Sequence, residues 1–267
     1  MTHDSSTSAA SVSAVGSRFN VSSSATHHET ARVPRRSPSA RTDVHRSREY
    51  VRQRMAANQP IVPAEGNRSL TYRATKRCVD SIGAIVLLVL FAPLLLAVLV
   101  VLTFTTGGRP LFIQRRVGYL GRQFPLIKFR TMLHDAVRLQ ARVTNEKDGP
   151  IFKNRTDPRI TRIGRVLRKT SIDEMPQLVN VLLGHMSLVG PRPPVASEVL
   201  QYESWQRRRL AIKPGLTCLW QVSGRSDIGF VDWVRMDLWY VENQRLATDL
   251  ELLIRTPWSV ISCRGAY

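Results

Sequence analysis

The chain has 267 residues, enough for one sizeable domain with additional segments. Its 39 Lys and Arg against 20 Asp and Glu give a formal net charge of +19, which favours an anionic partner such as nucleic acid, anionic lipid or a phosphorylated substrate. The three cysteines, Cys78, Cys218 and Cys263, are far apart, which argues against a zinc site or a disulfide framework. Each is expected to be a small buried apolar residue.

Residues 1–70 are rich in Ser, Ala, Arg and Thr and have no sustained apolar period. Such a segment buries too little surface to offset its ordering entropy, so a disordered basic tail is predicted. No apolar run occurs near residue 1, so no signal peptide is expected.

Residues 82–104 read IGAIVLLVLFAPLLLAVLVVLTF, without a charge. As a helix they would extend for roughly 35 Å, which is enough to cross a bilayer. Lys and Arg number 13 up to residue 77 and 26 after it, so charge does not assign an outside face. Pro93 lies at the midpoint and favours a bend. A spanning helix and a bent helix that enters and leaves on one face both remain open.

Residues 109–267 form a basic globular domain with mixed patterning. FPLIKF predicts a short strand, and helices are expected after Ser171 and near 195–211, 229–243 and 247–262. In the 229–243 helix, Trp233, Met236 and Tyr240 form an apolar stripe that suits either core packing or a membrane interface.

The first candidate for chemistry is the segment RKTSIDEMP, residues 168–176. Ser171 and Glu174 have the spacing of a capping box, so Asp173 and Glu174 could simply complement a helix dipole. The same geometry also suits a reaction site. A helix start would keep Asp173 ionised as a nucleophile, Glu174 could bind Mg²⁺, and Arg168 could clamp a phosphate.

Four further segments carry polar side chains that suit an anionic ligand. Each has a plain structural alternative, namely a solvated charge, a turn or a hairpin. Lys128 and Arg130 lie in KFRTM, Arg192 lies on the proline-framed loop GPRPP, Arg225 ends KPGLTCLWQVSGR, and Asp237 lies in the 229–243 helix. The motifs GxxxxGK[ST], HExxH, GxGxxG and DxD are all absent.

Taken in order, these segments resemble one known family. KRCVDSIGA precedes the proline-containing apolar run, PLFIQRRVGYLGRQFPLIKFRTM follows it, and then come DPRITRIGRVLRKTSIDEMPQLVNVLLGHMSLVGPRPP, KPGLTCLWQVSGRS and DLWYV. This order is similar to that of the bacterial sugar transferases, the monotopic phosphoglycosyl transferases, and it covers residues 72–263. The sequence departs from the family pattern at Ala92-Pro93, where Ser-Pro is common, and at Cys218, where glycine is common.

The resemblance implies an enzyme that transfers hexose-1-phosphate from UDP-glucose or UDP-galactose to undecaprenyl phosphate and releases UMP. Asp173 would be the nucleophile that forms a covalent phosphosugar intermediate, and Glu174 would be the Mg²⁺ ligand. The substrate-binding residues would be Lys128, Arg130, Arg168, Arg192, Arg225 and Asp237.

The expected fold is a helix-dominated α+β fold. It comprises a tail at 1–70, a re-entrant membrane helix hairpin at 71–108 and a small mixed α/β catalytic domain with interfacial amphipathic helices at 109–267. The expected setting is the bacterial inner membrane, with the catalytic domain cytoplasmic and exopolysaccharide biosynthesis as the pathway. The expected partners are inner-membrane lipid and the two substrates, not nucleic acid, and a homodimer stays open. The alternative is a non-enzymatic, membrane-anchored basic protein that binds anionic lipid or nucleic acid.

Overall fold

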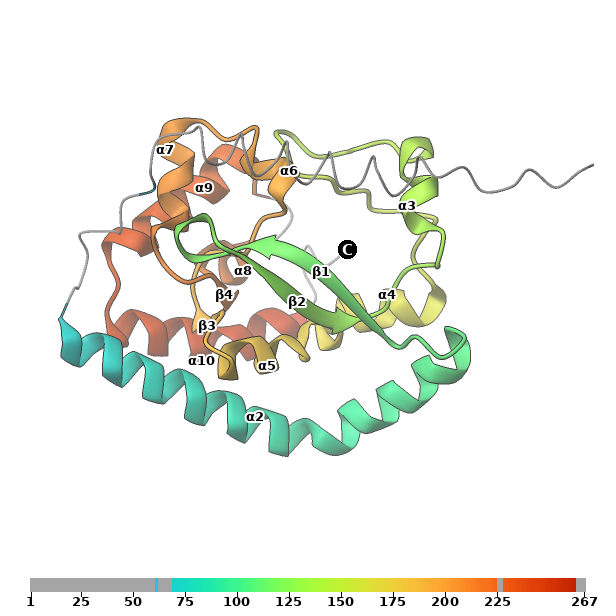
Figure 1. Ribbon diagram of the computed structural model, residues 1–267, viewed down its shortest axis with the longest axis horizontal. Coiled ribbons are helices and arrows are strands. Elements are labelled where there is room, and N and C mark those ends of the chain that lie inside the picture. Colours follow the sequence, from blue (N-terminus) through green and yellow to red (C-terminus); the bar gives the residue numbers. More distant parts are fainter. Residues whose placement is uncertain (1–60, 62–68, 225–227, 263–267) are drawn as a thin grey trace, which may run out of the picture. The chain divides into compact units, whose positions relative to one another are not determined.

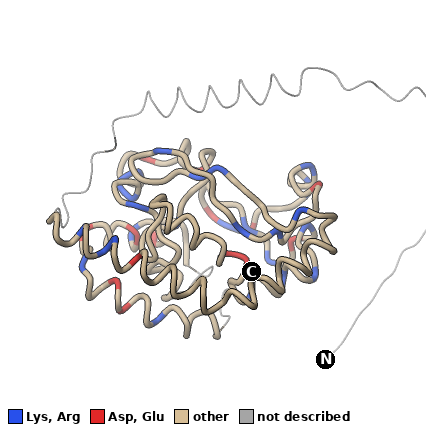
Figure 2. Tube along the Cα trace, turned by 60° about the horizontal axis from the view of Figure 1, so that its bottom comes forward, with Lys and Arg blue, Asp and Glu red and all other residues tan. Residues whose placement is uncertain are grey.

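The computed structural model describes residues 61, 69–224 and 228–262. Most of the predicted tail, and Arg225 among the predicted site residues, therefore lie outside the described residues. Within the described part, Lys and Arg positions outnumber Asp and Glu positions (Figure 2).

The long apolar segment forms one helix, α2, which runs from Leu70 to Thr105 and contains Pro93. By length and composition it is the one described helix that could cross a membrane, and its most apolar window has a mean hydropathy of 3.4. The helix continues through Pro93 and bends along its length (Figure 1). The predicted bend therefore occurs without a break in the helix, because a proline removes only one backbone hydrogen bond and packing holds both sides. The re-entrant topology stays a prediction.

Both halves of α2 pack on the globular domain, but largely on different elements of it. Ala84, Leu87 and Leu88 join a core cluster with residues of α5 (Gln177–Leu182) and β3 (Ser187–Val189). Nearer the C-terminal end, Leu95, Val98, Leu99 and Leu102 pack with Phe129 and Leu167. The opposite side of the helix is exposed and apolar, at Ile82, Ile85, Val86, Val89, Leu90, Leu96, Val100 and Phe104.

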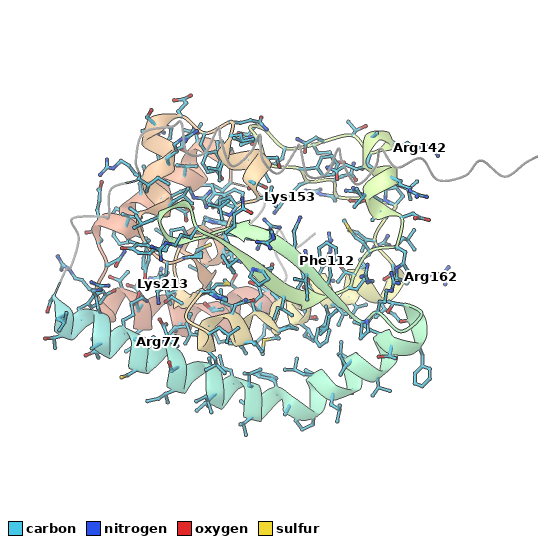
Figure 3. All side chains as sticks on the ribbon, in the orientation of Figure 1. Arg77, Phe112, Arg142, Lys153, Arg162 and Lys213 are labelled. Atoms are coloured by element: carbon cyan, nitrogen blue, oxygen red, sulfur yellow. The ribbon has the colours of Figure 1, made fainter. Side chains whose placement is uncertain are left out.

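Polar contacts anchor the N-terminal part of α2. Arg77 donates to the carbonyls of Val181 and Leu182, both at 2.6 Å, and so satisfies the last carbonyls of α5 (Figure 3). The buried Asp80 carboxylate accepts from the Ser187 hydroxyl at 3.0 Å and from the backbone N–H of Leu188 at 2.9 Å. Cys78 of the same helix is exposed, so the expectation that it is buried is wrong, whereas Cys218 is buried. Cys78 lies on a helix whose apolar side is only partly covered by protein.

Two short sheets accompany the helices. Strands β1 (Leu111–Val117) and β2 (Gln123–Phe129) form an antiparallel hairpin, in which Leu111 pairs with Phe129. The FPLIKF strand is confirmed. Strands β3 (Ser187–Val189) and β4 (Gly215–Thr217) pair in parallel. At Gly215 an added Cβ would lie 2.0 Å from the backbone nitrogen of Gly190. The two backbone segments therefore approach closely only because no side chain intervenes.

The remaining elements complete a helix-dominated α+β fold, which confirms the predicted class (Figure 1). Instead of one helix over 195–211, the chain forms three short turns, because a loop around Tyr202 separates α6 from α7. The helices predicted at 229–243 and 247–262 are confirmed as α9 and α10. The short and C-terminal elements are η1 (Tyr119–Gly121), α3 (Ala136–Leu139), η2 (Gln140–Arg142), α4 (Arg162–Lys169), η3 (Ile172–Glu174), α5 (Gln177–Leu182), α6 (Ala196–Val199), α7 (Ser204–Arg207), η4 (Arg208–Ala211), α8 (Leu219–Ser223), α9 (Phe230–Glu242) and α10 (Leu246–Ser262).

The stripe on α9 belongs largely to a second core cluster. Trp233 and Tyr240 are buried, and the Trp233 ring lies 4.0 Å from that of Trp220 between centroids. Core packing is therefore the correct interpretation of this stripe. The extended backbone of Cys218, with φ of −148°, does not require the glycine common in the family.

Candidate active site

Asp173 lies in the single turn η3 between α4 and α5, and its residue is only 6% exposed. The turn begins at Ser171, which adopts a left-handed conformation with φ of +58°. Ser171 makes no side-chain capping hydrogen bond, so the predicted capping box is wrong. A capping box needs an extended backbone at its first residue, whereas Ser171 has a left-handed one.

The side chain of Glu174 instead pairs with Arg192, at 2.8 Å between Oε1 and Nη1. Arg192 lies on the proline-framed loop after β3, so two segments distant in sequence meet here. The Arg192 guanidinium holds the pKa of the Glu174 carboxyl below its usual range, although burial opposes this effect.

Asp173 has a different electrostatic environment. Burial and the adjacent Glu174 raise the pKa of the Asp173 carboxyl to about 7, whereas Lys128, Arg168 and Arg192 oppose the rise. A single turn offers little dipole, so burial and the neighbouring charges influence this carboxyl more than the helix start does. An ionised Asp173 stays a prediction. Burial, together with Arg116 and Arg168, lowers the pKa of Lys128 to about 8.

The Glu174–Arg192 pair lies in a small hollow beside the β1–β2 hairpin. The hollow is lined by Arg116, Leu126, Lys128, Glu174, Gln177, Arg192, Pro193, Gly215 and Leu216. Lys128, Glu174 and Arg192 were predicted from the sequence, whereas Arg116 and Gln177 were not. Arg116 and Lys128 lie on paired strands, and only the hairpin register brings their side chains to one face.

The structure places the other predicted residues differently. Arg168 donates from Nε to the Thr131 hydroxyl at 2.9 Å. Its positive charge opposes the rise in the pKa of Asp173. Arg130 contacts the hairpin backbone, with its Nε 2.8 Å from the carbonyl oxygen of Arg109. Neither arginine lines the hollow.

Asp237 lies behind the site. It is 1% exposed and pairs with Arg209 at 2.5 Å, and burial raises the pKa of Asp237 to about 6 against the opposing charge of Arg209. Arg209 donates in turn to the backbone carbonyl of Arg192 at 3.1 Å. The pair thus supports the Arg192 loop, while substrate binding by Asp237 stays a prediction that a raised KM for Asp237→Asn would support.

Comparisons with known proteins identify the family. The family profile described as "Bacterial sugar transferase" matches residues 71–263. The chain is 40% identical over 199 residues to "Exopolysaccharide production protein ExoY" of Sinorhizobium fredii, covering 72% of this chain and 88% of that protein. The chain belongs to the bacterial sugar transferase family.

Two other relatives carry names that describe a reaction. "UDP-galactose-lipid carrier transferase" of Erwinia amylovora is 42% identical over 202 residues, which cover 73% of this chain and 42% of that protein. "UDP-glucose:undecaprenyl-phosphate glucose-1-phosphate transferase" of Caulobacter vibrioides is 39% identical over 202 residues, covering 72% of each chain. This sugar transferase therefore spans less than half the length of the Erwinia relative.

The donor set at the turn of this sugar transferase is compatible with Mg²⁺. Asp173 and Glu174 are adjacent carboxylates, and Glu174 raises the pKa of Asp173 through like-charge repulsion. Within the described residues, no group of three or more His, Cys, Asp or Glu side chains could hold a metal ion by itself. Mg²⁺ is commonly bound by one or two carboxylates together with substrate phosphates, so the site would bind it only together with an anionic substrate.

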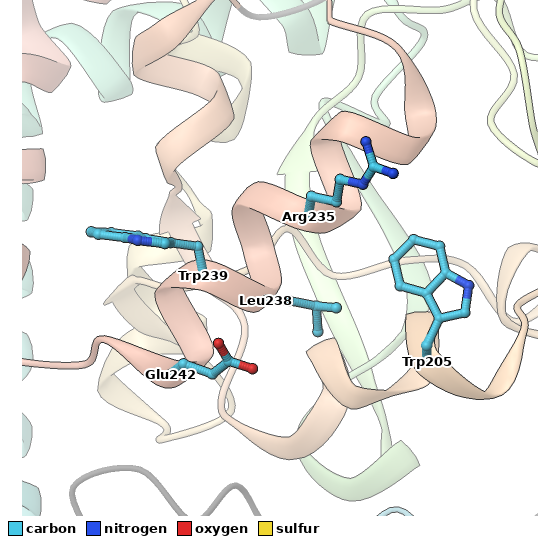
Figure 4. Close-up of a pocket in the computed structure, with 5 residues that line it drawn as sticks. All are labelled: Trp205, Arg235, Leu238, Trp239 and Glu242. Atoms are coloured by element: carbon cyan, nitrogen blue, oxygen red, sulfur yellow. The ribbon is translucent and has the colours of Figure 1, made fainter.

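A second hollow of the sugar transferase lies between α7 and α9 and is lined by Trp205, Arg235, Leu238, Trp239 and Glu242 (Figure 4). Its two charged side chains already have partners, because Arg235 pairs with Asp232 and Glu242 pairs with Arg208, both at 3.1 Å. It therefore lacks the excess positive charge found around Glu174.

Proposed function

We propose that the chain transfers hexose-1-phosphate from a UDP-sugar to undecaprenyl phosphate and releases UMP. The observation that carries the proposal is the convergence on one turn of a buried carboxylate, Asp173, with the Glu174–Arg192 pair and the cations Lys128 and Arg168. A buried carboxylate among cations suits attack on a phosphate, because the cations stabilise charge on the transferring group. The names of the Erwinia and Caulobacter relatives support the same reaction.

In the first step, the Asp173 carboxylate attacks the β-phosphorus of the donor. A bond forms between a carboxylate oxygen and phosphorus, the bond from that phosphorus to the oxygen bridging the two phosphates breaks, and UMP leaves with that oxygen. In the second step, a phosphate oxygen of the acceptor attacks the same phosphorus and the Asp173–phosphorus bond breaks. The carboxylate is regenerated, so no other reactant is consumed.

The surrounding residues position and neutralise the phosphates. Arg192 is held by Glu174 on one side and, through its backbone carbonyl, by Arg209 on the other. Lys128 and Arg168 lie close enough to influence the charge of Asp173. Glu174 would hold Mg²⁺ together with the donor phosphates. When bound, this ion supplies further stabilisation of negative charge on the transferring phosphate.

The test measures UMP release by full-length protein in detergent, with undecaprenyl phosphate, Mg²⁺ and a panel of UDP-sugars. We expect UMP from UDP-glucose or UDP-galactose, in line with the names of the relatives. The reaction is the first membrane step of exopolysaccharide assembly under this proposal. If no donor yields UMP, the proposed reaction is refuted, and a non-enzymatic basic membrane protein becomes the better explanation.

Membrane attachment through α2 and α10 follows from their exposed apolar residues. The outer side of α2 is apolar, and α10 exposes Leu246, Leu250, Ile254, Trp258 and Ile261 at helical spacing. Tyr72 and Lys76 of α2 both contact Asp249 of α10, at 3.4 and 2.8 Å, so the two helices are joined. Both surfaces would lie in lipid, and the acceptor's chain would stay there too.

A re-entrant topology is expected, because both halves of α2 pack against the same globular domain. In a Cys78→Ala, Cys263→Ala background, single cysteines at Ser69 and Arg115 report the two sides of the helix. A membrane-impermeant maleimide should label both positions in inverted inner-membrane vesicles and neither in intact spheroplasts. Labelling of one position in each preparation would indicate a spanning helix instead.

A further inference from the structure

Arg116 of β1 faces the site from the hairpin. It pairs in register with Phe124, and its Nη1 donates to the carbonyl of Pro193 at 3.1 Å. Pro193 directly follows Arg192, so this contact joins the hairpin to the loop that carries the Glu174 partner. The guanidinium lines the same hollow as Lys128, Glu174 and Arg192.

The charges of Glu198 and Glu174 act on Arg116, but neither carboxylate forms an ion pair with it. Among the described residues it forms no ion pair, and its Nε is buried without a hydrogen-bond partner. Two buried arginines each have their own carboxylate: Arg159 pairs with Asp157 at 2.7 Å, and Arg209 pairs with Asp237. Arg116 is half-buried and has no such pair, so its guanidinium is suited to bind an external anion.

The local charge of the hollow selects the kind of anion. Arg116, Lys128 and Arg192 contribute three positive charges against one carboxylate, Glu174. Burial, and to a smaller extent the charge of Arg192, lowers the pKa of Arg116 to about 10. The guanidinium therefore stays protonated at neutral pH. A phosphate group offers several acceptor oxygens to such a cluster, and a guanidinium can bind it through two parallel hydrogen bonds.

We infer that Arg116 is a further phosphate-binding residue of the active site, in addition to Arg168 and Arg192. The inference rests on the proposed function, because both substrates of that reaction carry phosphate beside the transferred group. The bound phosphate belongs either to the uridine nucleotide of the donor or to the polyprenyl phosphate acceptor. The chemistry is the same in both cases, and the experiment separates them.

Full-length Arg116→Met is compared with Arg115→Met, a matched control because Arg115 is the preceding residue of β1 and is exposed on the other face. We expect a rise of roughly 10- to 100-fold in one substrate KM for Arg116→Met, as for loss of a charged hydrogen bond. A rise for the UDP-sugar, with weaker inhibition by UMP, assigns the nucleotide phosphate. A rise for undecaprenyl phosphate alone assigns the acceptor phosphate. Both KM values within about 2-fold of those of Arg115→Met would overturn the inference.

Arg116→Gln is a second variant that is expected to fold, because its amide can still donate to the Pro193 carbonyl although the charge is lost. If Arg116→Met does not fold, the same KM comparison is made with Arg116→Gln. Calorimetric titration with inorganic pyrophosphate needs no turnover. Binding to wild type that Arg116→Gln weakens by about 10-fold or more supports the subsite even if no donor releases UMP. Unchanged binding, or no binding to wild type, overturns it.

Discussion

Asp173→Asn should lower UMP release by more than about 10³-fold, because an amide cannot replace a carboxylate as the attacking group. Asp173 is buried among Lys128, Arg168 and Arg192, whose charges act on it directly. The variant should still bind the donor, since the amide keeps the size of the side chain and removes a negative charge. The measurement is UMP release with the donor that wild type uses, together with donor affinity by calorimetry.

Asp232→Asn is the matched control, since Asp232 has an exposed side chain and pairs only with Arg235. Acid quenching of wild type with donor and without acceptor should show a covalent adduct of one hexose phosphate, which Asp173→Asn lacks. An Asp173→Asn enzyme with activity near that of Asp232→Asn would remove Asp173 from the mechanism.

The pKa of Asp173 also gives the reaction a pH dependence. Burial raises this pKa to about 7, so the carboxylate fraction increases as the pH rises through that value. Because only the carboxylate attacks, kcat/KM should fall by about tenfold for each pH unit below the pKa. A flat profile between pH 5 and pH 7 would show that Asp173 titrates lower in the working enzyme.

Arg192→Met should have the next largest effect, a loss of about 2–5 kcal/mol, which is roughly 30- to 5,000-fold in kcat/KM. The substitution removes a phosphate contact and leaves Glu174, whose side chain is 19% exposed, without its partner at 2.8 Å. The measurement is kcat/KM for the UDP-sugar.

Arg208→Met provides the comparison, because its pair with Glu242 is exposed on both sides, at 62% and 56%. An exposed pair contributes little, so this variant should stay within about 3-fold of wild type. A double-mutant cycle of Arg192→Met with Glu174→Gln should show strong non-additivity. Additive effects would mean that the two residues act separately.

Features that depend on a local run of residues could be predicted from the sequence. The apolar run gave α2, and apolar periodicity gave α9 and α10, because each pattern is contained in the element itself. Asp173, Glu174 and Arg168 lie within seven residues, so their proximity was also evident. The pairing of Glu174 with Arg192 joins residues 18 positions apart and needed the tertiary structure.

The errors have the same physical origin. The left-handed backbone of Ser171 at the junction of α4 and η3 is not evident from a sequence that has the spacing of a capping box. Arg116 was not predicted, because only the hairpin register places it on the face of the sheet that carries Lys128. The pairing of Asp237 with Arg209 was not foreseen, because Arg209 lies 28 residues earlier and on another element. Substrate contact by Asp237 stays a prediction.

The hydrogen bonds between Arg77 of α2 and the end of α5 link the depth of α2 in the membrane to the position of Asp173. Arg77 holds the last carbonyls of α5, and the turn with Asp173 lies just before the first residue of that helix. With α2 seated in lipid, Asp173 would be carried at a fixed height above the acyl chains. The phosphate of a lipid-bound acceptor has its own preferred height, set by the thickness of the leaflet. Turnover would then respond to acyl-chain length, and a bilayer of mismatched thickness would slow the second half-reaction without altering any residue of the site.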